Sequence, residues 1–104
     1  MSIGAAQYGG FNAQTAAGTI TLAAGDDAYQ AIDPGGSARN VDLPDLGTSG
    51  RGMVVVDNTA DASEVITLRD AANSNATVGT PTQNESAVCH FSEGTWVCVV
   101  GAAN

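Results

Sequence analysis

A β-hairpin pattern near the C-terminus constrains the fold of this 104-residue chain more than any other feature. Two runs of alternating residues, Ser86–Ser92 and Thr95–Val100, flank the dipeptide Glu93-Gly94. A two-residue loop that ends in glycine is typical of the tight turn between two antiparallel strands. We therefore expect these residues to form two paired strands, which places the chain among the β-rich folds.

The short loop also fixes the register of the hairpin. Counting outward from the loop gives the pairs Ser92–Thr95, Phe91–Trp96, His90–Val97 and Cys89–Cys98. Hydrogen-bonded and non-hydrogen-bonded pairs alternate, so the aromatic pair and the cysteine pair fall where side chains approach most closely. Alternation also places these four side chains on one face, and Phe91 and Trp96 are expected to form a core aromatic pair.

The same register brings the sulfur atoms of Cys89 and Cys98 within reach of each other, so that a disulfide is possible. Two interpretations stay open at this point. A disulfide needs oxidising surroundings, whereas the chain carries no secretory signal and is expected to be made in the cytoplasm, where thiols stay reduced. In the second interpretation, both cysteines are free and buried as small apolar residues.

The rest of the chain consists of short apolar or alternating runs that are separated by turn residues. The expected strands are Thr19–Leu22, Ala28–Ile32, Arg39–Leu43, Met53–Val56, Glu64–Arg69 and Ala76–Gly79. The continuous apolar run Met53–Val56 is typical of a central strand that is covered on both faces. No segment has a convincing helical period. About eight short strands predict an all-β fold, either an antiparallel β-sandwich or a jelly-roll-like barrel, formed by residues 19–104 as one domain.

Residues 1–18 differ from this pattern. They are mainly small or polar, and they include two isolated aromatic residues, Tyr8 and Phe11. The segment has neither the period of a strand nor that of a helix. We expect an extended N-terminal arm that docks on a partner through Tyr8 and Phe11, and the alternative is a disordered tail.

The charge balance excludes several classes of partner. The chain has 11 acidic residues, three arginines and no lysine, which gives a net charge of −8. Nucleic acids and anionic membranes are bound through clustered basic residues, and these arginines are scattered singly. No apolar stretch approaches the length of a transmembrane helix. We therefore expect neither nucleic-acid binding nor membrane binding.

The sequence also lacks the residue patterns that carry catalysis. Cys89 and its neighbour His90, the only histidine, should point to opposite faces of their strand, which argues against a Cys-His nucleophile or a zinc site. No phosphate-binding or dinucleotide-binding motif occurs. The acidic residues lie almost entirely in predicted turns, where aspartate caps the backbone. We expect no enzymatic activity, no metal ion and no cofactor.

From Asn40 onward, several short motifs follow one another in a familiar order. They are Val41-Asp42-Leu43-Pro44 before a Gly-rich loop, Met53–Asn58, Val65–Leu68, Thr77–Gly79 and Glu93–Val97. This order resembles small β-modules of tailed-bacteriophage virion proteins: capsid decoration (cement) proteins, head fibres and tail fibres.

The resemblance implies a function in the virion. Such proteins are commonly homotrimers that sit on the capsid exterior, with N-terminal arms lying over the major capsid protein. We therefore expect a structural protein that is synthesised in the host cytoplasm and stabilises a capsid by bridging coat subunits. Charged residues make up only 13% of the chain, about half of the usual share, which is compatible with a surface covered by partners.

A second hypothesis is a carbohydrate-binding β-module that is displayed on a virion or fibre. Sugar-binding platforms need exposed aromatic side chains with hydrogen-bonding groups beside them. The candidates are Trp96 with Phe91, or Tyr29. The exposure of these rings distinguishes the two hypotheses.

Overall fold

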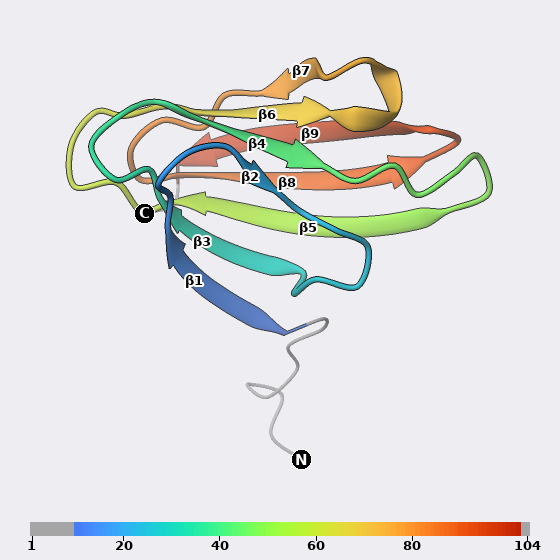
Figure 1. Ribbon diagram of the computed structural model, residues 1–104, viewed down its shortest axis with the longest axis horizontal. Coiled ribbons are helices and arrows are strands. Elements are labelled where there is room, and N and C mark those ends of the chain that lie inside the picture. Colours follow the sequence, from blue (N-terminus) through green and yellow to red (C-terminus); the bar gives the residue numbers. More distant parts are fainter. Residues whose placement is uncertain (1–9, 103–104) are drawn as a thin grey trace.

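The computed structural model describes residues 10–102, in which nine strands form two sheets that pack face to face (Figure 1). The strands are β1 (Phe11–Thr15), β2 (Ile20–Thr21), β3 (Tyr29–Asp33), β4 (Arg39–Leu43), β5 (Arg51–Asn58), β6 (Ile66–Asp70), β7 (Ala76–Gly79), β8 (Glu85–Ser92) and β9 (Thr95–Ala102). A short 3-10 helix, η2 (Ala71–Asn73), follows β6. Within these residues, no helix is long and apolar enough to cross a membrane. The predicted all-β, sandwich-like fold is confirmed.

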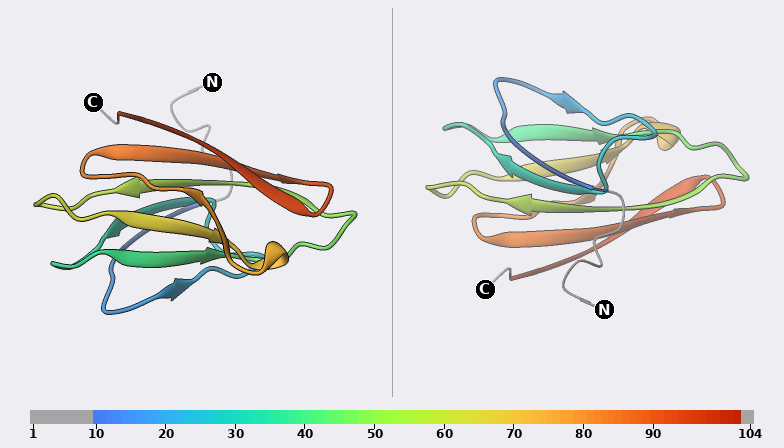
Figure 2. Two further views of the ribbon diagram at one scale, coloured as in Figure 1. Left: turned by 90° about the horizontal axis from the view of Figure 1, so that it is seen from above. Right: turned by 90° about the horizontal axis from the view of Figure 1, so that it is seen from below.

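The two sheets are mixed, and they do not close into a barrel. The larger sheet has the order β1-β3-β5-β8-β9 and the smaller has the order β2-β4-β6-β7, and Figure 2 shows them as two layers. The first six strands alternate between the sheets, so that β1, β3 and β5 run parallel, as do β2, β4 and β6. The prediction of an antiparallel fold is therefore wrong. The early turns connect a strand of one sheet to a strand of the other. Two parallel neighbours such as β1 and β3 are therefore joined through β2, which lies in the opposite sheet.

The sequence does not predict strand β1, because its polar residues face the interior of the sandwich and its apolar residues face solvent. Asn12 and Gln14 point inward, and their side-chain amides donate hydrogen bonds to Oε1 of the buried Gln30, at 3.0 and 3.2 Å. Phe11 and the other alternate residues of β1 face solvent. The predicted boundary at residue 18 is therefore wrong for residues 11–15, which form an edge strand of the larger sheet.

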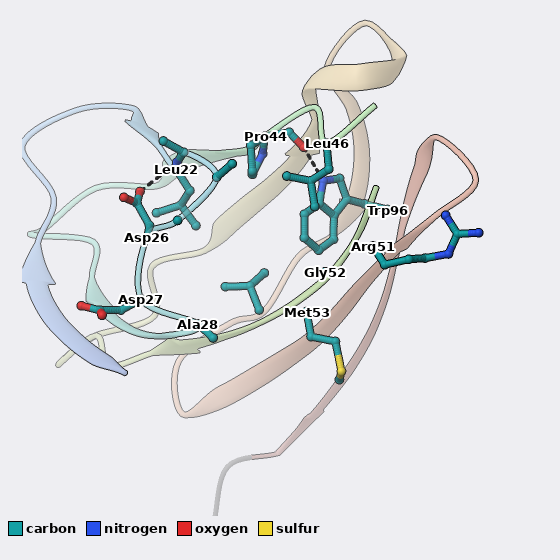
Figure 3. A pocket seen from close by; sticks show the side chains of 14 residues that line it. Leu22, Asp26, Asp27, Ala28, Pro44, Leu46, Arg51, Gly52, Met53 and Trp96 are labelled. Atoms are coloured by element: carbon teal, nitrogen blue, oxygen red, sulfur yellow. Dashed lines mark hydrogen bonds between the residues drawn. The ribbon is translucent and has the colours of Figure 1, made fainter. Parts of the chain in front are cut away.

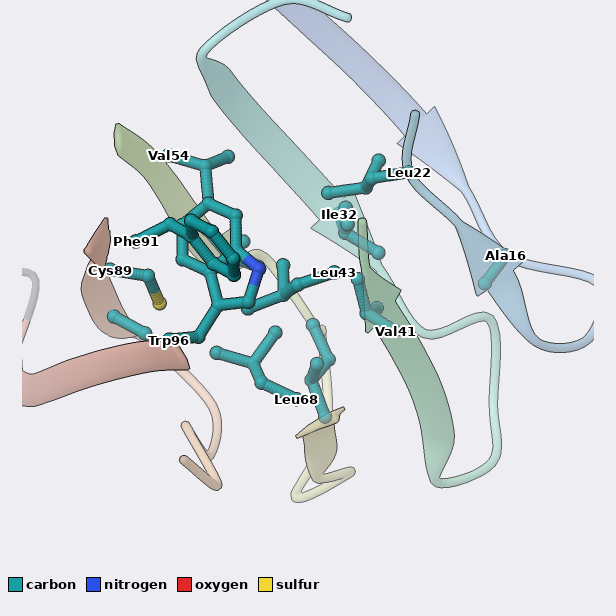
Figure 4. Packing of buried hydrophobic residues seen from close by; sticks show 13 residues of the cluster. Ala16, Leu22, Ile32, Val41, Leu43, Val54, Leu68, Cys89, Phe91 and Trp96 are labelled. Atoms are coloured by element: carbon teal, nitrogen blue, oxygen red, sulfur yellow. The ribbon is translucent and has the colours of Figure 1, made fainter. Parts of the chain in front are cut away.

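The core fills the space between the sheets with side chains from both (Figure 4). The aromatic rings of Phe91 and Trp96 pack together toward one end of the core, with their centroids 5.3 Å apart and their planes at 61°. The indole Nε1 donates a hydrogen bond of 2.8 Å to the carbonyl oxygen of Pro44. The predicted core aromatic pair is confirmed. The other apolar residues buried with it are Ala16, Leu22, Ile32, Val41, Leu43, Val54, Val56, Ile66, Leu68, Ala87 and Cys89.

The C-terminal hairpin has the predicted register at every pair from Ser92–Thr95 to Cys89–Cys98. Glu93 and Gly94 have φ angles of 55° and 83°, the two successive positive values that a tight hairpin turn requires. Cys89 and Cys98 are joined in a disulfide with a Cα–Cα distance of 4.1 Å. The bond ties β8 to β9 across the pair at which strands approach most closely.

A buried carboxylate joins the two sheets at one end of the sandwich. Asp70, which is 1% exposed, accepts hydrogen bonds from the backbone amides of Ala72 (3.1 Å) and Trp96 (3.0 Å). It also accepts from the side chains of Asn73 (2.8 Å) and Thr95 (3.2 Å). Asp70 therefore caps η2 and holds the start of β9 against the smaller sheet.

Candidate interaction surface

The outer face of the five-stranded sheet carries a continuous row of apolar side chains, all exposed except the half-buried Val55. One residue from each strand contributes, and each lies beside its neighbour in the register of the sheet. The row beside it adds two more apolar residues, on either side of His90. We call this surface the apolar strip, and it consists of Phe11, Tyr29, Val55, Val88 and Val99 with Met53 and Val97.

The exposure of the strip is high for residues of this kind. Phe11 and Val97 are each 57% exposed, Met53 is 62% exposed and Val99 is 72% exposed. Scattered apolar residues are normal on a protein surface, but a contiguous apolar patch marks an interaction site. The strip runs across the full width of the sheet.

Strand β5 was expected to be covered on both faces, and in the structure only one face is covered. Its run Met53–Val56 occupies the central position of the larger sheet, as predicted, and Val54 and Val56 are buried in the core. Met53 and Val55, however, point to the outer face, which this chain leaves uncovered. The prediction that both faces of this strand are covered is therefore wrong for the single chain.

A cluster of polar side chains borders the strip. The carboxylate of Asp57 accepts hydrogen bonds from the hydroxyls of Tyr29 and Ser86. The bond to Asp57, with a smaller effect of burial, raises the pKa of Tyr29 above its usual value. The contribution of this bond to stability is therefore present in full below the ordinary pKa of tyrosine, and it is lost as the pH rises from there through the raised pKa.

The aromatic residues singled out from the sequence fall into three groups. Phe11 is exposed, with its ring centroid 5.5 Å from that of Tyr29. Phe91 and Trp96 are buried at 0% and 4% exposure, so they cannot form a sugar-binding platform. Tyr8 lies outside the described residues.

Two hollows open on the surface. The first, of about 250 Å³, lies between the end of the core and the loop after β4, and Leu22, Leu46, Met53 and Trp96 line its apolar part (Figure 3). The second, of about 330 Å³, is polar and lies over Asn12, Gln14 and Gln30.

Cys89 faces the core in its disulfide, whereas His90 points outward from the same strand. Among residues 10–102, no three His, Cys, Asp or Glu side chains are grouped so that they could hold a metal ion. Comparison with protein families, curated proteins and solved structures finds no match to this chain.

Proposed function

We propose that this chain is a virion structural protein that decorates a phage capsid and stabilises it by bridging coat-protein subunits. The observation that carries the proposal is the apolar strip, because an exposed apolar surface five strands wide favours a protein that works in a larger assembly. The resemblance of the motifs from Val41 to Val97 to phage virion modules supports the same class.

The rigidity of the domain suits this role. A decoration protein stiffens a shell when it contacts two coat subunits and resists their relative movement. The disulfide between β8 and β9 and the hydrogen bonds of Asp70 hold the two sheets and the hairpin in one arrangement. Strain applied by the shell is then carried by the whole domain.

We further propose that the protein acts as a homotrimer, in which each copy contributes one set of contacts to the major capsid protein. Repeating a weak contact by symmetry raises the overall affinity without requiring a tight single site. Tyr8 and the exposed Phe11, at the start of β1, are the proposed docking residues.

Co-sedimentation with phage heads tests this function. We expect the purified full chain to bind heads assembled from the matching major capsid protein, and to saturate at a stoichiometry set by the lattice. Replacing Tyr8 and Phe11 together with serine is expected to abolish that binding, whereas Thr77→Ser on the exposed face of β7 serves as the matched control. Wild-type protein that stays in the supernatant with every head preparation would exclude capsid decoration.

A carbohydrate-binding module displayed on a virion or fibre is the second candidate. The observation that favours it is the exposed ring pair of Phe11 and Tyr29, which has the polar Asp57 and Ser86 beside it. Binding of a host surface glycan that is lost in Tyr29→Ala, by protein that does not bind heads, would favour this candidate over decoration.

A further inference from the structure

We propose that the partner of the apolar strip is a second copy of this chain, which covers the strip on β3, β5, β8 and β9 and leaves Phe11, on the edge strand β1, to the capsid. The inference rests on the proposed function in one respect, namely that the protein works in several copies. It names a surface through which copies meet in pairs, and the threefold contacts of the proposed trimer are made by other surfaces. Flat sheets pack face to face at about 10 Å separation when their facing side chains are apolar. A regular apolar sheet face is therefore complementary in shape to another copy of itself.

The distribution of charge favours a second copy at this surface. Chains with a net charge of −8 repel each other, so copies can only meet where carboxylates are scarce. The outer face of the five strands carries two carboxylates. The oxygens of Asp57 already accept from Tyr29 and Ser86, and Asp33, at the end of β3, accepts from the backbone amide of Gly35. An apolar contact between identical faces needs no opposite charges to balance it.

The size of the face is sufficient for such a contact. The four strands β3, β5, β8 and β9, at a spacing of about 4.8 Å and with five to eight residues at about 3.3 Å each, present a face of roughly 450 Å² in projection. Side-chain relief raises the accessible area of that face toward the roughly 800 Å² per partner that a standard interface buries.

The pattern of β5 indicates that something covers the strip, and the composition of β9 indicates that a neighbour protects the edge beside it. The continuous apolar run of β5 is the pattern of a strand buried on both faces, although in the single chain Met53 is exposed and Val55 is only half-buried. Strand β9 lies at the edge of the sheet, and its eight residues, Thr95–Ala102, include neither a charged residue nor a proline. Exposed edge strands usually carry such residues to prevent pairing, so this strand has the composition of one that is protected by a neighbour.

Sedimentation velocity and native mass spectrometry of the full chain, without reductant and without capsids, test the inference. We expect the wild-type chain to form an oligomer with an even number of copies, because contact between two identical faces has twofold symmetry. Val99→Glu places a charge on the strip at a position that is 72% exposed, so the change leaves the fold of one copy intact. It is expected to raise the dissociation constant by about a hundredfold, because a contact with a second copy would bury that charge.

The matched control is Thr77→Glu, which adds the same charge on the exposed face of β7 in the other sheet and is expected to assemble as the wild type does. An intact disulfide mass and an unchanged circular dichroism spectrum confirm folding of both variants. A wild-type chain that stays monomeric at all concentrations overturns the inference, and so does a Val99→Glu variant that assembles like wild type. Because no capsid is present, failure here is separate from failure to bind heads.

Discussion

Replacing Asp70 with alanine is expected to lower the free energy of unfolding by about 3–5 kcal/mol. The carboxylate is 1% exposed and accepts four hydrogen bonds, and two of the donors are the backbone amides of Ala72 and Trp96. Alanine would leave these donors without a partner next to the core. Against a total stability of about 5–15 kcal/mol for a domain of this kind, the loss is severe.

Chemical denaturation of the variant measures this effect. Asp70→Asn should retain part of the stability. The amide oxygen of asparagine still accepts hydrogen bonds, but its NH₂ group would face donors and cannot accept from them. The matched control is Asp61→Ala in an exposed turn, which is expected to change the stability by no more than about 0.5 kcal/mol. A value for Asp70→Ala within about 1 kcal/mol of wild type would show that the carboxylate does not hold the sheets together.

Truncating Phe91 to alanine is expected to be similarly damaging, at about 3–5 kcal/mol. Phe91 is fully buried on β8 and packs edge-on against Trp96, so its removal opens a cavity inside the core. Each kcal/mol corresponds to a shift of about 4–8 °C in a domain of this size, so the melting temperature should fall by at least about 12 °C.

Calorimetry of the Phe91→Ala variant with its disulfide intact measures the shift. Phe91→Leu keeps much of the volume and should cost clearly less, which separates the cavity from other effects of substitution. A melting temperature for Phe91→Ala equal to that of wild type would contradict the position given to Phe91 in the core.

The register of the hairpin could be predicted because it depends only on local residues, whereas the outer ends of both strands extend beyond the expected ones. A two-residue loop at Glu93-Gly94 determines every pair that follows, including Cys89–Cys98 and Phe91–Trp96. Two expected strands, Arg39–Leu43 and Ala76–Gly79, also match the structure at both ends. Where a strand alternates and its inward residues are apolar, the pattern alone identifies it.

The parallel pairing of the first six strands could not be predicted in the same way. A turn such as Asp33-Pro34-Gly35-Gly36 reverses the chain equally well between paired strands and between opposite sheets. Strand β1 was missed because Asn12 and Gln14 face inward, where they meet another polar residue, Gln30. Hydrogen bonding between polar side chains replaces the apolar signal at this end of the sandwich.

One part of the apolar strip could be predicted from local residues, and the other part depends on the pairing of distant strands. Val88, Val97 and Val99 could be recognised as apolar residues on the face of the hairpin opposite the disulfide, since alternation separates the two faces. Their alignment with Val55, Tyr29 and Phe11 depends on the parallel registers, which the sequence does not reveal. Asp70 was likewise assigned to a polar turn, and its burial depends on the distant strand β9.

The central claim is that the outer face of the five-stranded sheet is an interface. The rate at which His90 is chemically modified tests this claim most directly. His90 is the only histidine of the chain, and it lies exposed between Met53 and Val97 in the register of the sheet. Modification by diethyl pyrocarbonate, located by peptide mass spectrometry, therefore reports on one point of this face. We expect slow modification in the wild-type chain and fast modification in Val99→Glu. Equal, fast modification of both proteins would contradict the account, because the face would then be open to solvent in the protein as it exists.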